Sequence, residues 1–159
     1  MERLTLALAG GALRFLYRFA GTELIADRVL TELGPPEEIS PVAGLAGGLV
    51  APKAEGEEVF AGEAFLAGTK RFLRASWNGD AAWLQIDQSA VFQVDCAAGQ
   101  IHATALSPAP FPADLEHLAL GPPLLLALAA RGVFALHAAA VEVDGRLVAL
   151  LGESGAGKS

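Results

Sequence analysis

The stretch EEVFAGEAFLAGTKRFLRASWNGDAAWLQIDQSAVFQVDCAAGQIHATAL, residues 57–106, decides the fold predicted for this chain. Short apolar runs alternate in it with polar clusters, and Asn78-Gly79-Asp80 is a strong turn signal between two of the runs. Further turn-like clusters follow at residues 87–89 and 97–100. This spacing predicts an antiparallel meander, and we expect its inner face to carry the large aromatic side chains Phe72, Trp77, Trp83 and Phe92.

The residues before the meander predict a hairpin and a helix. Two apolar runs, LTLALAG and ALRFLYRFA, flank Gly10-Gly11, which is typical of a β-hairpin. The run TELIADRVLTELG favours a helix that Thr22 caps and Gly34 ends, although its β-branched residues leave an extended alternative open. Residues 35–56 are rich in Pro, Gly and Ala and are predicted to be loop or weak structure.

The residues after the meander predict a connection, a helix and two strands. Three prolines between residues 107 and 114 favour the connection, and a short helical turn is expected after Asp114. PPLLLALAARG predicts a helix from about Pro122 to Arg131, which is apolar nearly all round and should be buried between layers. VFALHAAAVEV and RLVALL are predicted strands around the tight turn Asp144-Gly145. RLVALL is a nearly continuous apolar run, which is typical of a strand that is buried on both faces.

Composition and charge argue against several classes of protein. The 159 residues include 18 acidic and 11 basic side chains, a net charge of −7, whereas a nucleic-acid binder normally shows a basic stripe. No run reaches the ~18–20 uninterrupted apolar residues of a membrane span, and no signal peptide is visible. The single cysteine, Cys96, is expected to be a small buried hydrophobe. We therefore expect a cytoplasmic protein without nucleic-acid or membrane partners.

The strand RLVALL leads directly into GESGAGKS, residues 152–159, which has the pattern of a phosphate-binding loop. Its glycines permit a tight backbone whose N–H groups point inward at an anion. Lys158 can reach the β- and γ-phosphates of ATP, and the Ser159 hydroxyl can ligate Mg²⁺. The candidate nucleotide-binding residues are Gly152, Glu153, Ser154, Gly155, Ala156, Gly157, Lys158 and Ser159, with Ser159 as the metal ligand.

Such a loop normally opens a helix whose first N–H groups and positive dipole end face the phosphates. No residue follows Ser159 in this sequence, so neither that helix nor a downstream magnesium ligand or base is supplied. We therefore expect the 159-residue chain by itself to be inactive. An uncovered RLVALL strand would also expose apolar surface, which predicts a homo-oligomer or marginal solubility.

Residues 136–159, LHAAAVEVDGRLVALLGESGAGKS, resemble the start of the catalytic domain of HPr kinase/phosphorylases and HPr-kinase-like proteins. These proteins share a P-loop core related to phosphoenolpyruvate carboxykinase. The resemblance rests on His137, 15 residues before Gly152, on the Asp144-Gly145 turn, and on a loop close to the family's G-D-S-G-x-G-K-S. It implies ATP and Mg²⁺ as cofactors, a catalytic His137 near the γ-phosphate, and a protein or peptide as phosphate acceptor.

The residues and the resemblance together predict an α+β fold. A β-rich, antiparallel N-terminal region (residues 1–112) would precede the first strands of a P-loop, phosphoenolpyruvate carboxykinase-like kinase core (residues 113–159). The expected function is the N-terminal part of an ATP-dependent, HPr-kinase-like serine kinase. The alternatives are a non-catalytic peptide- or protein-binding module with a vestigial P-loop, and a different P-loop enzyme such as a transport ATPase or a small-molecule kinase. His137 could also be an ordinary hydrogen-bonded core residue, as is expected of His102 and His117.

Overall fold

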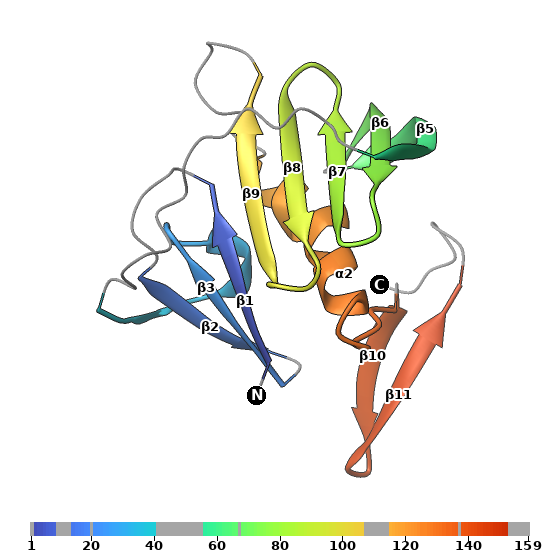
Figure 1. Ribbon diagram of the computed structural model, residues 1–159. Coiled ribbons are helices and arrows are strands. Elements are labelled where there is room, and N and C mark those ends of the chain that lie inside the picture. Colours follow the sequence, from blue (N-terminus) through green and yellow to red (C-terminus); the bar gives the residue numbers. More distant parts are fainter. Residues whose placement is uncertain are drawn as a thin grey trace.

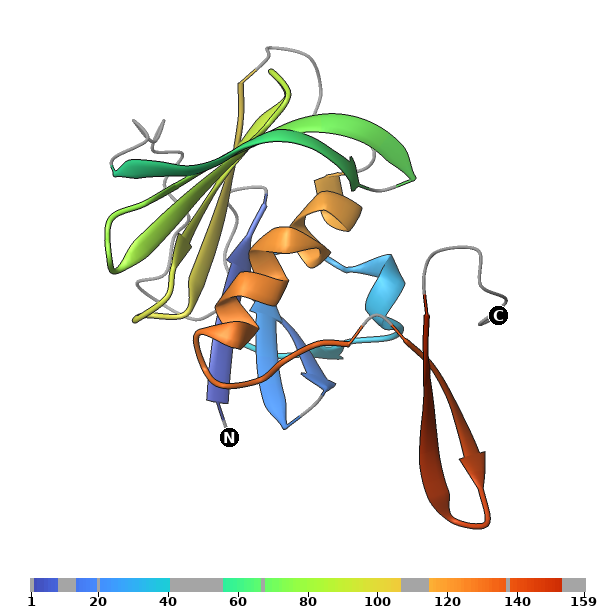
Figure 2. The same cartoon turned by 90° about the vertical axis from the view of Figure 1, so that its right-hand side faces the viewer.

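The computed structural model describes residues 2–8, 14–19, 21–40, 56–66, 68–106, 115–136 and 138–152. These residues form a β-rich α+β structure with one mixed nine-stranded sheet and a separate two-stranded hairpin (Figure 1). Two helices lie on one side of the sheet, and the hairpin projects away from this body (Figure 2). The predicted α+β class is confirmed at this level.

The sheet combines an antiparallel meander with N-terminal strands whose order in the sheet differs from their order in the sequence. From one edge to the other the strands are β4 (Glu37–Glu38), β2 (Phe15–Phe19), β3 (Thr22–Ala26), β1 (Glu2–Ala7), β9 (Gln100–Ala105), β8 (Ala90–Asp95), β7 (Ala81–Ile86), β6 (Thr69–Trp77) and β5 (Glu57–Leu66). The meander strands β5 to β9 are antiparallel, as predicted for residues 57–106. The β2–β3 and β2–β4 pairs are also antiparallel, whereas β1 is parallel to both β3 and β9.

The helices α1 (Leu115–Leu120) and α2 (Pro122–Ala129) complete the core of the sheet. Helix α2 begins with its two prolines at the first helical positions, as predicted. Leu124 and Leu128 on α2 are buried, but Leu125 is 45 % exposed. The prediction that this helix is buried between layers is therefore correct only for the face that contacts the sheet. The division of the chain at residues 112 and 113 stays a prediction.

The predicted hairpin around Gly10-Gly11 is wrong in its strand pairing. Both flanking strands form, but β1 pairs in parallel with β3 and β9 instead of pairing with β2. Gly10 and Gly11 themselves lie outside the described residues. Leu4 and Leu6 of β1 are fully buried because they lie in the core that the sheet shares with α1 and α2, on a central strand with a neighbour on each side. Local sequence patterns carry no information on such a long-range insertion.

The predicted helix from Thr22 is also wrong, and the extended alternative is what forms. Strand β3 turns back on β2 at Gly21, whose φ of 73° suits a residue without Cβ. The Asp27 carboxylate then accepts hydrogen bonds from the Leu8 amide at 3.1 Å. The Leu30 amide donates to the Tyr17 hydroxyl at 2.5 Å. These tertiary contacts hold the segment extended, and only Thr31–Leu33 makes a 3₁₀ turn.

The four aromatic residues of the meander divide between the two faces of the sheet. Phe92 is fully buried in the main core and Trp77 packs against that core, as predicted. Trp83 is buried with Ala81 and Val91 in a separate small cluster, and Phe72 is 42 % exposed. The prediction is wrong for Trp83 and Phe72, because successive side chains of a strand alternate between faces.

Candidate functional site

The predicted nucleotide loop follows a regular antiparallel hairpin. Strands β10 (Ala138–Val143) and β11 (Arg146–Leu151) pair from Val143–Arg146 to Ala138–Leu151. The two turn residues between them, Asp144 and Gly145, have φ angles of 50° and 72°. Positive φ at both positions is the type I′ geometry that matches the twist of the strands. The predicted turn is confirmed, and β11 ends at Leu151, directly before Gly152.

Of the residues predicted to bind nucleotide or to act in catalysis, the structure describes only Gly152. Gly152 follows the last residue of β11 outside regular structure. His137, the proposed catalytic residue, lies outside the described residues, as do Glu153, Ser154, Gly155, Ala156, Gly157, Lys158 and Ser159. Their roles in binding ATP and Mg²⁺ stay predictions. The described neighbours of His137 and Gly152, which are Ala138 and Leu151, pair with each other.

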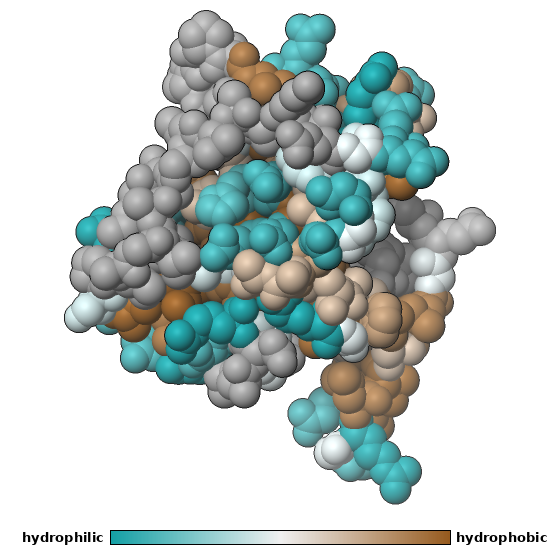
Figure 3. All heavy atoms as spheres, viewed as in Figure 1, coloured by the Kyte–Doolittle hydropathy of each residue, from teal (hydrophilic) through white to brown (hydrophobic). Residues whose placement is uncertain are grey.

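The hairpin exposes apolar side chains on both of its faces. Every residue of β11 is exposed, although the strand is typical of burial on both faces. One face carries Leu147 and Leu151, which are 77 % and 66 % exposed, and the other carries Val148 and Leu150. Figure 3 shows this hydrophobic surface on the projecting hairpin. The expectation of uncovered apolar surface in this chain is confirmed.

The side chains most able to do chemistry elsewhere in the described residues already have ordinary partners. His102 Nε2 lies 3.3 Å from Gln100 Oε1, and His117 Nε2 lies 3.1 Å from Glu32 Oε1. Burial, reinforced by Asp95, raises the pKa of the Cys96 thiol and makes it a weaker nucleophile at neutral pH. No group of three or more His, Cys, Asp or Glu in the described part of the chain could hold a metal ion.

The sheet face opposite the helices carries a hollow that was not predicted from the sequence. It measures about 580 Å³, and its floor comes from β6, β7 and the turn after β7. The Arg74 guanidinium lies 5.7 Å from the centre of the Phe72 ring and 3.4 Å from a carboxylate oxygen of Glu58. The hollow is lined by Phe72, Arg74, Gln85, Asp87 and Gln88. The sequence signal for this face was the two-residue spacing of Phe72 and Arg74 in β6, on either side of Leu73, which packs against the main core.

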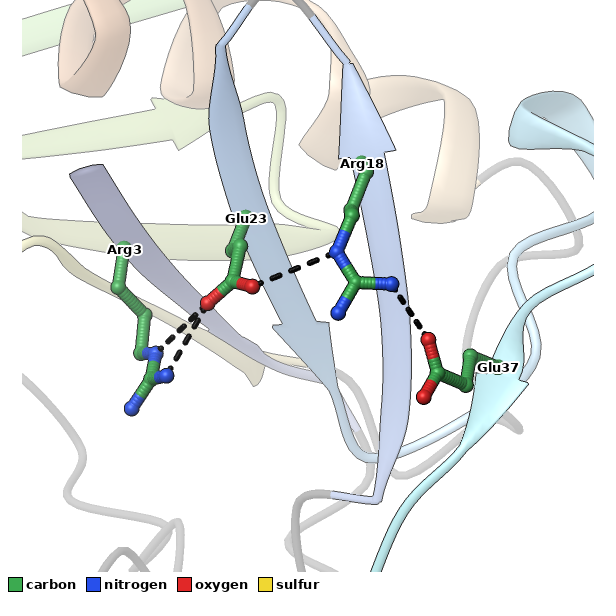
Figure 4. Close-up of polar contacts among 4 residues, drawn as sticks. All are labelled: Arg3, Arg18, Glu23 and Glu37. Carbon is green, nitrogen blue, oxygen red and sulfur yellow. Dashed lines mark hydrogen bonds and ion pairs between the residues drawn. The ribbon is translucent and has the colours of Figure 1, made fainter. Parts of the chain in front are cut away.

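A charge network crosses four neighbouring strands at the other end of the sheet (Figure 4). Arg3 Nη2 lies 3.0 Å from Glu23 Oε2, and Arg18 lies 3.4 Å from the second oxygen of Glu23. Arg18 Nη1 also lies 2.5 Å from Glu37 Oε2. The Glu37 carboxylate, together with Glu23, raises the pKa of Arg18, and Arg3 with Arg18 lowers the pKa of Glu23. The opposite charges lie on neighbouring strands and pair with each other, so they favour the observed register of these strands over shifted ones.

Glu23→Gln is expected to lower the urea midpoint of unfolding modestly at pH 7. The folded-state pKa of Glu23 is depressed, so its charge stabilises the fold above the ordinary Glu pKa of about 4.3. That stability is lost as the pH falls through the folded-state pKa. The difference between variant and parent should therefore shrink in acid. Glu38→Gln, which removes an exposed carboxylate from β4 outside the network, is the control. A Glu23→Gln difference that is constant with pH would contradict the assignment.

No family model matches the chain, and no curated protein or solved structure matches it significantly. No helix in the described part of the chain is long and apolar enough to cross a membrane. The described residues define a β-rich α+β protein whose exposed, largely apolar hairpin directly precedes the sequence GESGAGKS.

Proposed function

We propose that this chain is the N-terminal part of an ATP-dependent serine kinase of the HPr-kinase-like class. The acceptor would be a serine of a protein or peptide, and the use of ATP suits a cytoplasmic location. One observation carries the proposal: a strand that is apolar on both faces runs directly into GESGAGKS. An apolar strand alone, or a Gly-rich sequence alone, does not indicate a nucleotide site. A short apolar strand followed by a Gly-rich loop is the context in which this motif binds phosphate.

The exposed faces of the hairpin support a layered α/β arrangement around it. Strands with apolar side chains on both faces are typical of sheets whose two faces are both covered, as in layered α/β proteins. The described helices α1 and α2 pack on the nine-stranded sheet and leave β11 exposed. We infer that β10 and β11 belong to the P-loop kinase core, and that further elements of that core cover them.

Within that core the loop residues would take the roles that their chemistry suits. Main-chain N–H groups from Gly152 to Gly157 would bind the phosphates, Lys158 would neutralise their charge, and Ser159 would ligate Mg²⁺. Bound Mg-ATP supplies the phosphoryl group and much of the charge stabilisation for its transfer. The pairing of Ala138 with Leu151 supports a place for His137 close to the start of the loop. There an imidazole N–H could donate a hydrogen bond to the γ-phosphate.

Lys158→Ala is expected to reduce phosphoryl transfer by at least 100-fold, because the variant loses the positive charge that meets the β- and γ-phosphates. The measurement is transfer of labelled phosphate from ATP to serine-containing peptides by the full polypeptide that carries this chain. Lys70→Ala removes an exposed lysine from β6, which pairs with Glu63 at 2.6 Å, and should leave transfer unchanged. Equal activity of the Lys158→Ala variant and the parent would overturn the assignment of the loop.

A second candidate function is a non-catalytic module that binds a peptide or protein and retains a vestigial loop. The polar and aromatic hollow around Phe72 and Arg74 favours it, because binding sites combine apolar surface with a few placed polar groups. The same assay separates the two candidates. A parent polypeptide that binds peptides but transfers no phosphate, with or without Lys158, would be a binding module.

A further inference from the structure

The two edges of the nine-stranded sheet are protected very differently. Edge strand β4 has only two residues, both glutamates, and follows Pro35-Pro36. Short, charged strands next to proline are the usual means by which a sheet edge avoids further pairing. Edge strand β5 has ten residues and no proline. Two of its three glutamates, Glu57 and Glu58, lie before a register shift that ends at Phe60, so that the stretch from Ala61 onward is regular and carries one charge, Glu63. Within the described part of the chain, no strand pairs with its outer side.

The outer side of β5 presents main-chain hydrogen-bonding groups. The Phe72 and Asp87 main chains contact each other, since the Asp87 amide donates to the Phe72 carbonyl at 2.8 Å. Phe72 in β6 therefore faces β7, and its neighbour Leu73 faces Gly62 of β5. The same alternation turns the amides and carbonyls of Ala61 and Glu63 outward. An added antiparallel strand would satisfy these groups.

Large apolar side chains accompany this open edge. Phe65 is 77 % exposed, Val59 is 62 % exposed and Phe60 is 45 % exposed. Together with the outward main-chain groups they form what we call the β5 edge, residues Val59–Phe65. Exposed apolar surface beside unpaired strand groups is typical of a site for strand addition.

We propose that two copies of this chain associate through the β5 edge by antiparallel pairing about a two-fold axis at Gly62. Each copy has a net charge of −7, but the β5–β6 hairpin is neutral, with three acidic and three basic residues. The acidic copies can therefore approach here without strong repulsion. The six charged residues are Glu57, Glu58, Glu63, Lys70, Arg71 and Arg74.

Pairing about Gly62 also suits the individual positions. It places Ala61 of one copy opposite Glu63 of the other, so that the two Glu63 carboxylates do not face each other directly. Gly62 meets the partner's Gly62 on the axis, and neither residue has a side chain of its own. The nearest side chain is that of Phe60, whose Cζ lies 3.3 Å from where a Cβ of Gly62 would be, so this ring would lie at the interface. The pairing would join two nine-stranded sheets into one continuous sheet. This proposal is independent of the kinase assignment.

Sedimentation velocity of the 159-residue chain tests the proposal. We expect the parent to be a dimer at about 100 µM, with Ala61→Pro and Phe65→Lys each shifting it to monomer. Ala61→Pro removes an outward N–H that has no role in the β5–β6 ladder, and Phe65→Lys leaves the backbone intact. Leu147→Lys, a control on the exposed β11, should remain dimeric. A monomeric parent would overturn the proposal, as would a dimer that only Leu147→Lys dissociates.

Cysteine cross-linking tests the register without relying on a loss of association. In a Cys96→Ser background, Gly62→Cys should form a covalent dimer on mild oxidation, because directly opposite residues in a non-hydrogen-bonded pair have Cα atoms about 4.5 Å apart. The new Cβ would lie 3.3 Å from Cζ of Phe60, a half-exposed ring that can turn aside. Ala64→Cys should form no covalent dimer, because the two copies of residue 64 would be offset by four residues along the strands, which is about 13 Å. Cross-linking of both variants to the same extent, or of neither, would overturn pairing at Gly62. Far-UV circular dichroism checks that every variant is folded.

Discussion

Phe92→Ala is expected to lower the free energy of unfolding by about 3–5 kcal/mol. Phe92 is fully buried in β8, in the core that the sheet shares with α1 and α2. Truncation removes the apolar contacts of the ring and leaves a cavity between sheet and helices. Total stabilities of small domains are about 5–15 kcal/mol, so this single change should remove a large part of the stability. Urea unfolding followed by circular dichroism measures it.

Phe134→Ala is the matched control for this prediction. Phe134 is 77 % exposed, so its truncation should change the stability by no more than about 0.5 kcal/mol. Equal losses in the two variants would contradict the described core. A loss confined to Phe92→Ala would confirm that Phe92 lies in the core and that Phe134 does not.

Gly99→Ala is expected to cost about 2–4 kcal/mol of stability. Gly99 has a φ of 70°, and a Cβ there would lie 1.9 Å from Nη2 of Arg131 and 3.0 Å from the Arg3 carbonyl oxygen. Arg131 Nη1 donates to the carbonyls of Cys96 and Ala127, each at 3.2 Å, and so ties the end of α2 to the turn between β8 and β9. An added methyl group would displace this guanidinium and strain the backbone.

Gly68→Ala separates the two causes of that cost. Gly68 has a φ of 73°, but a Cβ there would meet nothing within 4 Å. The control variant therefore has the backbone strain without the clash, and should lose only about 1 kcal/mol. If Gly99→Ala were no more destabilised than Gly68→Ala in urea, the Arg131 contact would carry no stability.

Local signals predicted the parts of the fold that local interactions determine. The turn at Asn78 is one such part, because the Asn78 side chain accepts hydrogen bonds from the amides of Asp80 and Ala81. The type I′ turn at Asp144-Gly145 and the start of α2 at Pro122 are others. For the candidate site, the strand before Gly152 was predicted from its apolar pattern and is present.

Predictions were wrong where distant residues compete with local preference. The segment from Thr22 has helical spacing, but pairing with β1 and β2 and burial of Leu24 make it a strand. The hollow beside Phe72 could not be predicted because it depends on how β6, β7 and the following turn lie together. The same holds for the contrast between the two sheet edges, which needs the full order of strands.

The sequence by itself determined the five-strand meander, the turns between its strands and the motif that carries the proposed function, since each depends on residues close together in the chain. Only the tertiary structure decided that β1 lies in parallel between β3 and β9, and that β5 is an open edge. The physical reason is that main-chain hydrogen bonds between strands are nearly independent of sequence. Which strands become neighbours is therefore decided by the burial of side chains from the whole chain.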